Sequence, residues 1–179
     1  MLLNYCFRRV AIRWGPVAFL ALGLQLIAIF APLGPDAVRR VFLVFSYLLL
    51  LSFTVANLRR PGLLLMGVGL LLNFLAIVSN GGLMPVAPDT LERVGPPPED
   101  VSLGEWVPHT KDVLLERADT RLWLLTDVLA WKNPTRLSAF SVGDVIIAAG
   151  LVVTLGELFL PRMRRSSPPA YPSDRLSSP

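Results

Sequence analysis

The sequence predicts an all-α integral membrane protein, a four-helix bundle with a small helical cap outside the cytoplasm. Apolar residues make up 53% of the 179 residues, and the mean hydropathy is +0.56, which is high for a soluble domain. Residues 41–57 and 61–79 contain no charged side chain. Residues 80–140 carry nine acidic and six basic side chains, so this segment is expected outside the lipid.

Four apolar runs approach the roughly twenty residues that a membrane-spanning helix needs. They cover about Pro16–Pro32, Val41–Asn57, Pro61–Ser79 and Val142–Leu160. Prolines stand at several of their ends, because proline is tolerated in the first turn of a helix and cannot continue a helix at its end. The membrane domain is therefore expected to span residues 16–160, after a cytoplasmic segment at residues 1–15.

Arginines at the ends of the runs predict their orientation. Basic residues are enriched in cytoplasmic loops. The arginines that follow this rule are Arg8, Arg9, Arg13, Arg59, Arg60, Arg162, Arg164 and Arg165. An even number of spans places all of them, and both termini, in the cytoplasm. Arg39 and Arg40 are exceptions. The pI near 9.8 thus reflects topology, and no nucleic-acid partner is expected.

Two further expectations concern the ends of the chain. The first run could instead be a cleaved signal peptide, although Pro32-Leu-Gly-Pro35 lacks the usual small-x-small cleavage site. The tail at residues 161–179 is rich in serine and proline, and it is expected to be disordered in the cytoplasm.

Amides are the main polar groups inside the runs. Gln25 lies in the first run and Asn73 in the third. Pairing between helices is the expected role, because buried amides in lipid bond across helices. A polar pathway past Gln25 and Asn73 is the alternative, and it would make the protein an oligomeric small-molecule carrier. The middle of each run lacks acidic and basic residues, which argues against ion transport.

The segment between the third and fourth runs is expected to form a cap of short helices over residues 83–138. Asn80-Gly81-Gly82 is typical of a helix end. Asp89 is expected to cap a short helix, with Glu92 completing a capping box and Gly95 ending it. Apolar residues at helical spacing predict an amphipathic helix over Lys111–Trp131. His109 is the sole histidine, so no metal site or cofactor is expected.

Asp127 stands near the end of the expected amphipathic helix, and Asp144 stands at the outer start of the fourth run. Ser141-Val-Gly-Asp144 has the form of a capping box for the fourth run, and Asp144 suits the positive end of a helix dipole. If the intervening chain folds back, the two carboxylates could instead face each other, share a proton and activate water. Four spans with an aspartate just before the last one are similar in outline to the signal peptidase II family, although only Phe140 and Asp144 match that family's motif.

The chain resembles an uncharacterised bacterial four-span family, domain of unknown function 5317. The resemblance rests on Asn80-Gly-Gly-Leu-Met-Pro85, the element around Pro88–Leu91, Leu124-Leu-Thr-Asp127 and Phe140-Ser-Val-Gly-Asp144, within residues 38–160. It implies a multi-pass protein of the bacterial inner membrane. It implies no activity.

The expected function is that of a non-enzymatic accessory protein. Its cap would contact a protein partner, a lipid or a second copy of the chain. A hydrolase that uses Asp127 and Asp144 is the alternative.

Overall fold

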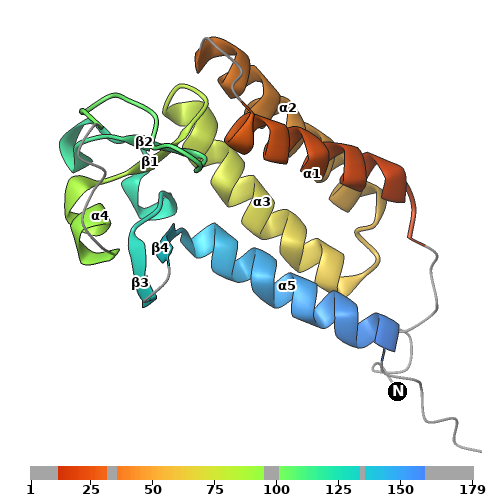
Figure 1. The fold of residues 1–179 in the computed structure, drawn as a ribbon. Coiled ribbons are helices and arrows are strands. Elements are labelled where there is room, and N and C mark those ends of the chain that lie inside the picture. The colour runs from red at the N-terminus through yellow and green to blue at the C-terminus, as the bar shows by residue number, and fades with distance from the viewer. Residues whose placement is uncertain (1–11, 32–35, 95–100, 134–135, 160–179) are drawn as a thin grey trace, which may run out of the picture.

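The computed structural model describes residues 12–31, 36–94, 101–133 and 136–159. Figure 1 shows the long helices side by side, with the smaller elements gathered at one end. The long helices are α1 (Gly15–Phe30), α2 (Asp36–Ala56), α3 (Pro61–Ser79) and α5 (Val142–Phe159). The smaller elements, which lie between α3 and α5, are β1 (Met84–Val86), α4 (Pro88–Val94), β2 (Asp112–Leu114), the 3-10 turns η2 (Arg117–Asp119) and η3 (Trp123–Leu125), β3 (Leu129–Asn133) and β4 (Arg136–Phe140).

The four apolar runs all form helices. Among the described residues, α2 and α3 are long and apolar enough to cross a membrane, and α1 is a shorter apolar helix. The prediction for the second run was wrong at its start, because α2 begins at Asp36 and includes both exceptional arginines. Arg39 is tolerated there because its guanidinium lies 3.6 Å from the centre of the Trp106 ring and donates to the Ala28 carbonyl.

Glycines bring α3 and α5 into close antiparallel contact. A Cβ atom at Gly69 would lie 2.5 Å from the Gly143 carbonyl oxygen, and one at Gly150 would lie 2.6 Å from the Met66 side chain. Small residues of this kind allow the backbones of membrane helices to approach one another. At the far end of the pair, Glu157 accepts a hydrogen bond of 3.1 Å from the Gly62 amide, in the first turn of α3.

The cap is a mixed α/β structure, so the prediction of a purely helical cap was wrong. β1 and β2 pair in parallel, with Met84 opposite Asp112, and β3 and β4 form an antiparallel hairpin. No amphipathic helix covers Lys111–Trp131. Pairing of β2 with β1 buries Val113 and Leu114, and Leu122 has a left-handed φ of 52° that a continuous helix does not allow. Tertiary pairing has overridden the helical spacing of the leucines.

The short helix expected near Asp89 is present as α4, but Asp89 does not cap it. The helix begins at Pro88, so Asp89 lies inside its first turn, and the Asp89 carboxylate pairs with Arg93 at 2.8 Å. A first-turn proline needs no backbone partner, which explains the earlier start. Gly95, the prolines at 96–98 and the tail at 161–179 lie outside the described residues.

Candidate functional site

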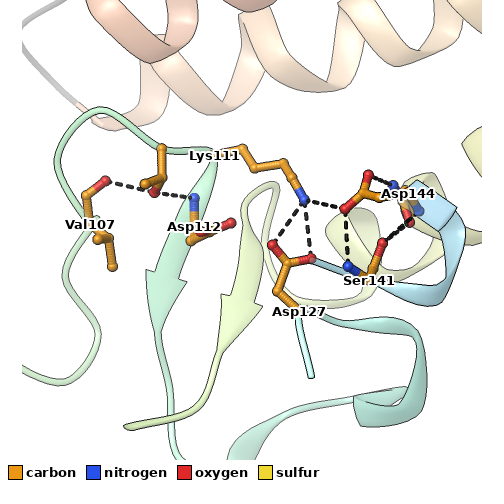
Figure 2. Close-up of polar contacts among 8 residues, drawn as sticks. Val107, Lys111, Asp112, Asp127, Ser141 and Asp144 are labelled. Atoms are coloured by element: carbon orange, nitrogen blue, oxygen red, sulfur yellow. Dashed lines mark hydrogen bonds and ion pairs between the residues drawn. The ribbon is translucent and has the colours of Figure 1, made fainter. Parts of the chain in front are cut away.

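A cluster of charged and polar side chains lies where the cap meets the helices. Lys111 and Asp112 enter it from the start of β2, and Asp127 enters from the segment after η3. Ser141 and Asp144 belong to the start of α5 (Figure 2), and Asn73 reaches the cluster from α3. Segments far apart in the sequence therefore meet at one polar centre.

Ser141 and Asp144 form the predicted capping box. The Ser141 amide donates to Asp144 Oδ2, and the Asp144 amide donates to Ser141 Oγ, each at 3.0 Å. Each side chain thus satisfies an amide that the first turn of α5 leaves without a helical partner. The negative charge of Asp144 also lies at the positive end of the helix dipole.

Asn73 fastens this capping box to α3. Its Nδ2 donates to Asp144 Oδ1 at 2.7 Å, and its Oδ1 accepts from Ser141 Oγ at 2.8 Å. Both side-chain contacts cross between helices, which agrees with the pairing role expected for this amide. The fit requires glycine at position 143, where a Cβ atom would lie 2.0 Å from Asn73 Oδ1.

Lys111 connects the cap to the helices. Its ammonium group donates to both carboxylate oxygens of Asp127, at 3.0 and 3.1 Å, and to Asp144 Oδ2 at 3.2 Å (Figure 2). The Asp127 side chain is only 1% exposed, whereas that of Asp144 is 31% exposed. The ammonium therefore binds one deeply buried carboxylate and one that water reaches.

Burial and neighbouring charges shift the pKa values of Lys111 and Asp112 in the cluster. Burial acts to lower the pKa of Lys111, but the charges of Asp127, Asp112 and Asp144 outweigh burial and hold this pKa well above its usual value. Burial, and then the negative charge of Asp127, raise the pKa of Asp112 well above its usual value. Both shifts favour the protonated forms, which are the ammonium of Lys111 and the neutral acid of Asp112.

Asp112 is the least satisfied member of the cluster. Its side chain is buried, and its Oδ1 has no hydrogen-bond partner among the described residues. Burial of an unpaired carboxylate oxygen is costly, and this is the same burial that raises the pKa of Asp112.

The structure brings together some of the residues that the sequence singled out. Asp127, Ser141, Asp144 and Asn73 all contact the cluster, and the Lys111 ammonium lies between Asp127 and Asp144. Gln25 is half-buried on α1, and no hydrogen bond joins it to this cluster in the described part of the chain.

Asn80, Gly81 and Gly82 end α3 nearby, as expected. Asn80 exchanges two hydrogen bonds of 2.8 Å with the backbone of Arg121, and both glycines have positive φ angles. This segment holds the start of the η3 region against the end of α3.

Sequence reasoning missed the roles of Lys111 and Asp112. It placed both on a helix, where their side chains would point in different directions. One signal was available, since Lys111 is one of only two lysines in a chain with fifteen arginines. His109 is exposed beside Phe30, and no group of three or more potential metal ligands occurs among the described residues.

The fold and the cluster define a mainly helical protein whose mixed cap is joined to α5 by the ion pair between Lys111 and the partly exposed Asp144. The chain belongs to a family of unknown function, DUF5317, whose model matches residues 9–155. No curated protein and no solved structure matches it.

Proposed function

We propose that this chain is a bacterial inner-membrane protein that crosses the membrane four times and uses its outer cap as a non-enzymatic interaction surface. The observation that carries the membrane assignment is the distribution of side chains on the long helices. Large apolar side chains point outward from all four, such as Phe19, Val41, Leu71 and Val152 at 78%, 66%, 47% and 69% exposure. An exposed apolar surface of this extent is typical of contact with lipid.

Several polar side chains of the same helices point inward, although Ser52 is exposed. The buried uncharged ones are Ser46, Thr54, Asn73 and Thr154. A soluble helix bundle has the reverse arrangement. An alkaline carbonate wash of membranes from expressing cells tests the assignment. The protein is expected to stay with the membrane, and release into the supernatant would contradict it.

The ends of the helices support the proposed orientation. Arg59 and Arg60 lie in the turn between α2 and α3, and the Arg13 backbone exchanges two hydrogen bonds of 2.8 Å with the Asn57 side chain. The cap follows the opposite end of α3. Basic residues at the end away from the cap favour a cytoplasmic location for that end and for both termini.

The proposed interaction surface is formed by exposed apolar side chains of the cap, called the cap patch below. This cap patch consists of Leu122, Trp123, Leu124, Leu129 and Trp131, with exposures between 37% and 66%. Tryptophan is enriched at the energetically important centres of protein interfaces. The charged cluster beneath the cap has a structural role in this account, because its carboxylates bind Lys111, Ser141 and Asn73.

Native mass measurement of the full-length protein tests the patch. The wild-type protein is expected to associate with a protein partner or a second copy, and Trp131→Ser is expected to weaken that association. Leu103→Ser is the matched control, because Leu103 is 55% exposed on the cap outside the patch. A wild-type protein that is only monomeric, with no bound protein, would contradict the proposal.

A membrane hydrolase is the second candidate. Asp127 and Asp144 both bind the Lys111 ammonium, and water reaches Asp144. This arrangement favours the candidate, because carboxylates with shifted pKa values often mark functional sites. Asp127→Asn and Asp144→Asn should then each abolish prolipoprotein processing in cells, while Asp119→Asn, on an exposed turn, should not. Unchanged processing in both variants would reject the hydrolase.

A further inference from the structure

A groove between α2 and α3 has the chemistry of a lipid site. It has a volume of about 430 Å³, within the range of roughly 300–1,000 Å³ that ligand sites occupy. The residues that line it are Arg40, Val41, Val44, Phe45, Leu48, Val78, Gly81 and Gly82. Arginine is the only charged side chain among them, and the other side chains are apolar.

Arg40 and Leu48 mark the two ends of the groove along α2. They are eight residues apart in one helix, which corresponds to roughly 12 Å along its axis. Arg40 lies at the end of α2 next to the cap, where its Nη1 donates to the Gly81 carbonyl at 3.0 Å. The groove therefore has a cationic end at the cap and an open apolar part that runs along α2 away from it.

The charge of Arg40 is not neutralised within the described chain. None of the ion pairs among the described residues includes Arg40, whereas its neighbour Arg39 is buried against Trp106. A guanidinium group binds phosphate well because its donors match the oxygen geometry. Most of the lining comes from α2, with Val78 near the end of α3 and the two glycines that follow it on the other side. Both helices are long and apolar enough to span a membrane.

We propose that this groove binds an anionic phospholipid, with its phosphate on Arg40 and an acyl chain beside Val44 and Leu48. The inference rests on the proposed membrane location. It also gives Arg40 a role that explains its departure from the orientation rule, because this arginine would bind lipid on the outer side of the membrane. The net negative charge of the headgroup complements Arg40, whereas a zwitterionic headgroup adds a cation.

The test is lipid retention by the full-length protein, measured by native mass spectrometry after equilibration with phosphatidylglycerol or phosphatidylcholine. The wild-type protein should retain phosphatidylglycerol in preference, and Arg40→Gln should reduce this preference about fivefold, the factor expected for one arginine near anionic lipid. Arg40→Lys should keep most of the preference. Arg59→Gln, at the opposite end of α2, is the matched control and should leave the preference unchanged.

Leu48→Trp tests the apolar part of the groove, because a larger side chain there would occupy the space proposed for the acyl chain. This variant should retain less of both lipids. The proposal is overturned if Arg40→Gln keeps the wild-type preference or if Arg59→Gln loses as much. It is also overturned if Leu48→Trp changes only the oligomeric mass, which would assign the groove to a second copy. The carbonate wash reports on membrane location separately, so a failed lipid test and a failed membrane assignment are distinguishable.

Discussion

Replacing Lys111 with methionine tests the role of the charged cluster most sharply. Methionine keeps an unbranched side chain of similar length and removes the ammonium that binds Asp127 and Asp144. Removing one partner of a buried ion pair costs about 3–5 kcal/mol, because it leaves an uncompensated charge. Asp127 is almost fully buried, but Asp144 is partly exposed and keeps its contacts with Ser141 and Asn73. We therefore expect a loss near the lower limit, about 3 kcal/mol.

The assay is equilibrium unfolding of the full-length protein at pH 7 in mixed micelles of dodecyl maltoside and SDS. Tryptophan fluorescence reports mainly on the cap, which contains Trp106, Trp123 and Trp131, whereas the fourth tryptophan, Trp14, precedes α1. Arg93→Met is the matched control, because the Arg93–Asp89 pair is more than half exposed on both sides. Exposed pairs of this kind contribute about 0.3–0.5 kcal/mol.

Coupling between Lys111 and Asp127 gives a second check on this prediction. If the two charges interact directly, Lys111→Met combined with Asp127→Asn should cost less than the sum of the single changes. The reasoning is refuted if Lys111→Met costs no more than Arg93→Met, or if the two changes at the cluster are additive.

Three further predictions concern the same junction. Gly143→Ala should cost about 1–3 kcal/mol through overpacking, because the added Cβ would meet Asn73. Gly23→Ala should not destabilise the protein, since no atom lies within 4 Å of its Cβ position. Thermal unfolding of both variants checks this prediction. Ser141→Ala should cost about 1–3 kcal/mol, because it removes a helix cap and leaves Asn73 Oδ1 without its donor. Unfolding in mixed micelles measures the loss of stability. A cost below that of replacing the exposed Ser102 with alanine would contradict the prediction. Asp112→Asn should flatten the dependence of stability on pH. The pKa of Asp112 is raised by folding, so its contribution is fully present below the ordinary value near 3.8 and is lost as the pH rises through the folded value; equal pH profiles for variant and wild type would contradict this.

The sequence predicted the long helices well, because lipid-sized apolar runs and prolines are local signals. Pro61–Ser79 was predicted at both of its boundaries. The start of α2 was missed because Arg39 is stabilised by Trp106, more than sixty residues away. A contact of that kind leaves no trace in local composition.

The cap was predicted less well, because its structure also depends on contacts between residues far apart in the sequence. The leucines of Lys111–Trp131 have helical spacing, yet two of them belong to a parallel strand and a left-handed turn. Pairing between β1 and β2 depends on a partner 28 residues away in register, and periodicity does not report it. The capping box at Ser141 and Asp144 was predictable because both of its partners lie within one helical turn.

The candidate site combines residues that local sequence signals predicted with a contact between distant residues that they did not predict. Asp127 and Asp144 were singled out as a possible pair from their positions on either side of the last loop. The ammonium that joins them was missed, since Lys111 reaches the cluster only through the strand that replaced the predicted helix.

Site-directed cysteine labelling tests the central claim, the four-span topology with an outer cap, most directly. Cys6 is the sole cysteine, so Cys6→Ser provides a background for single cysteines at Ser102 on the cap and at Arg59 in the turn between α2 and α3. A membrane-impermeant maleimide should label Ser102→Cys in cells with a permeabilised outer membrane, and should label Arg59→Cys only after the inner membrane is broken. Equal labelling of both positions before lysis, or protection of the cap position alone, would contradict the account.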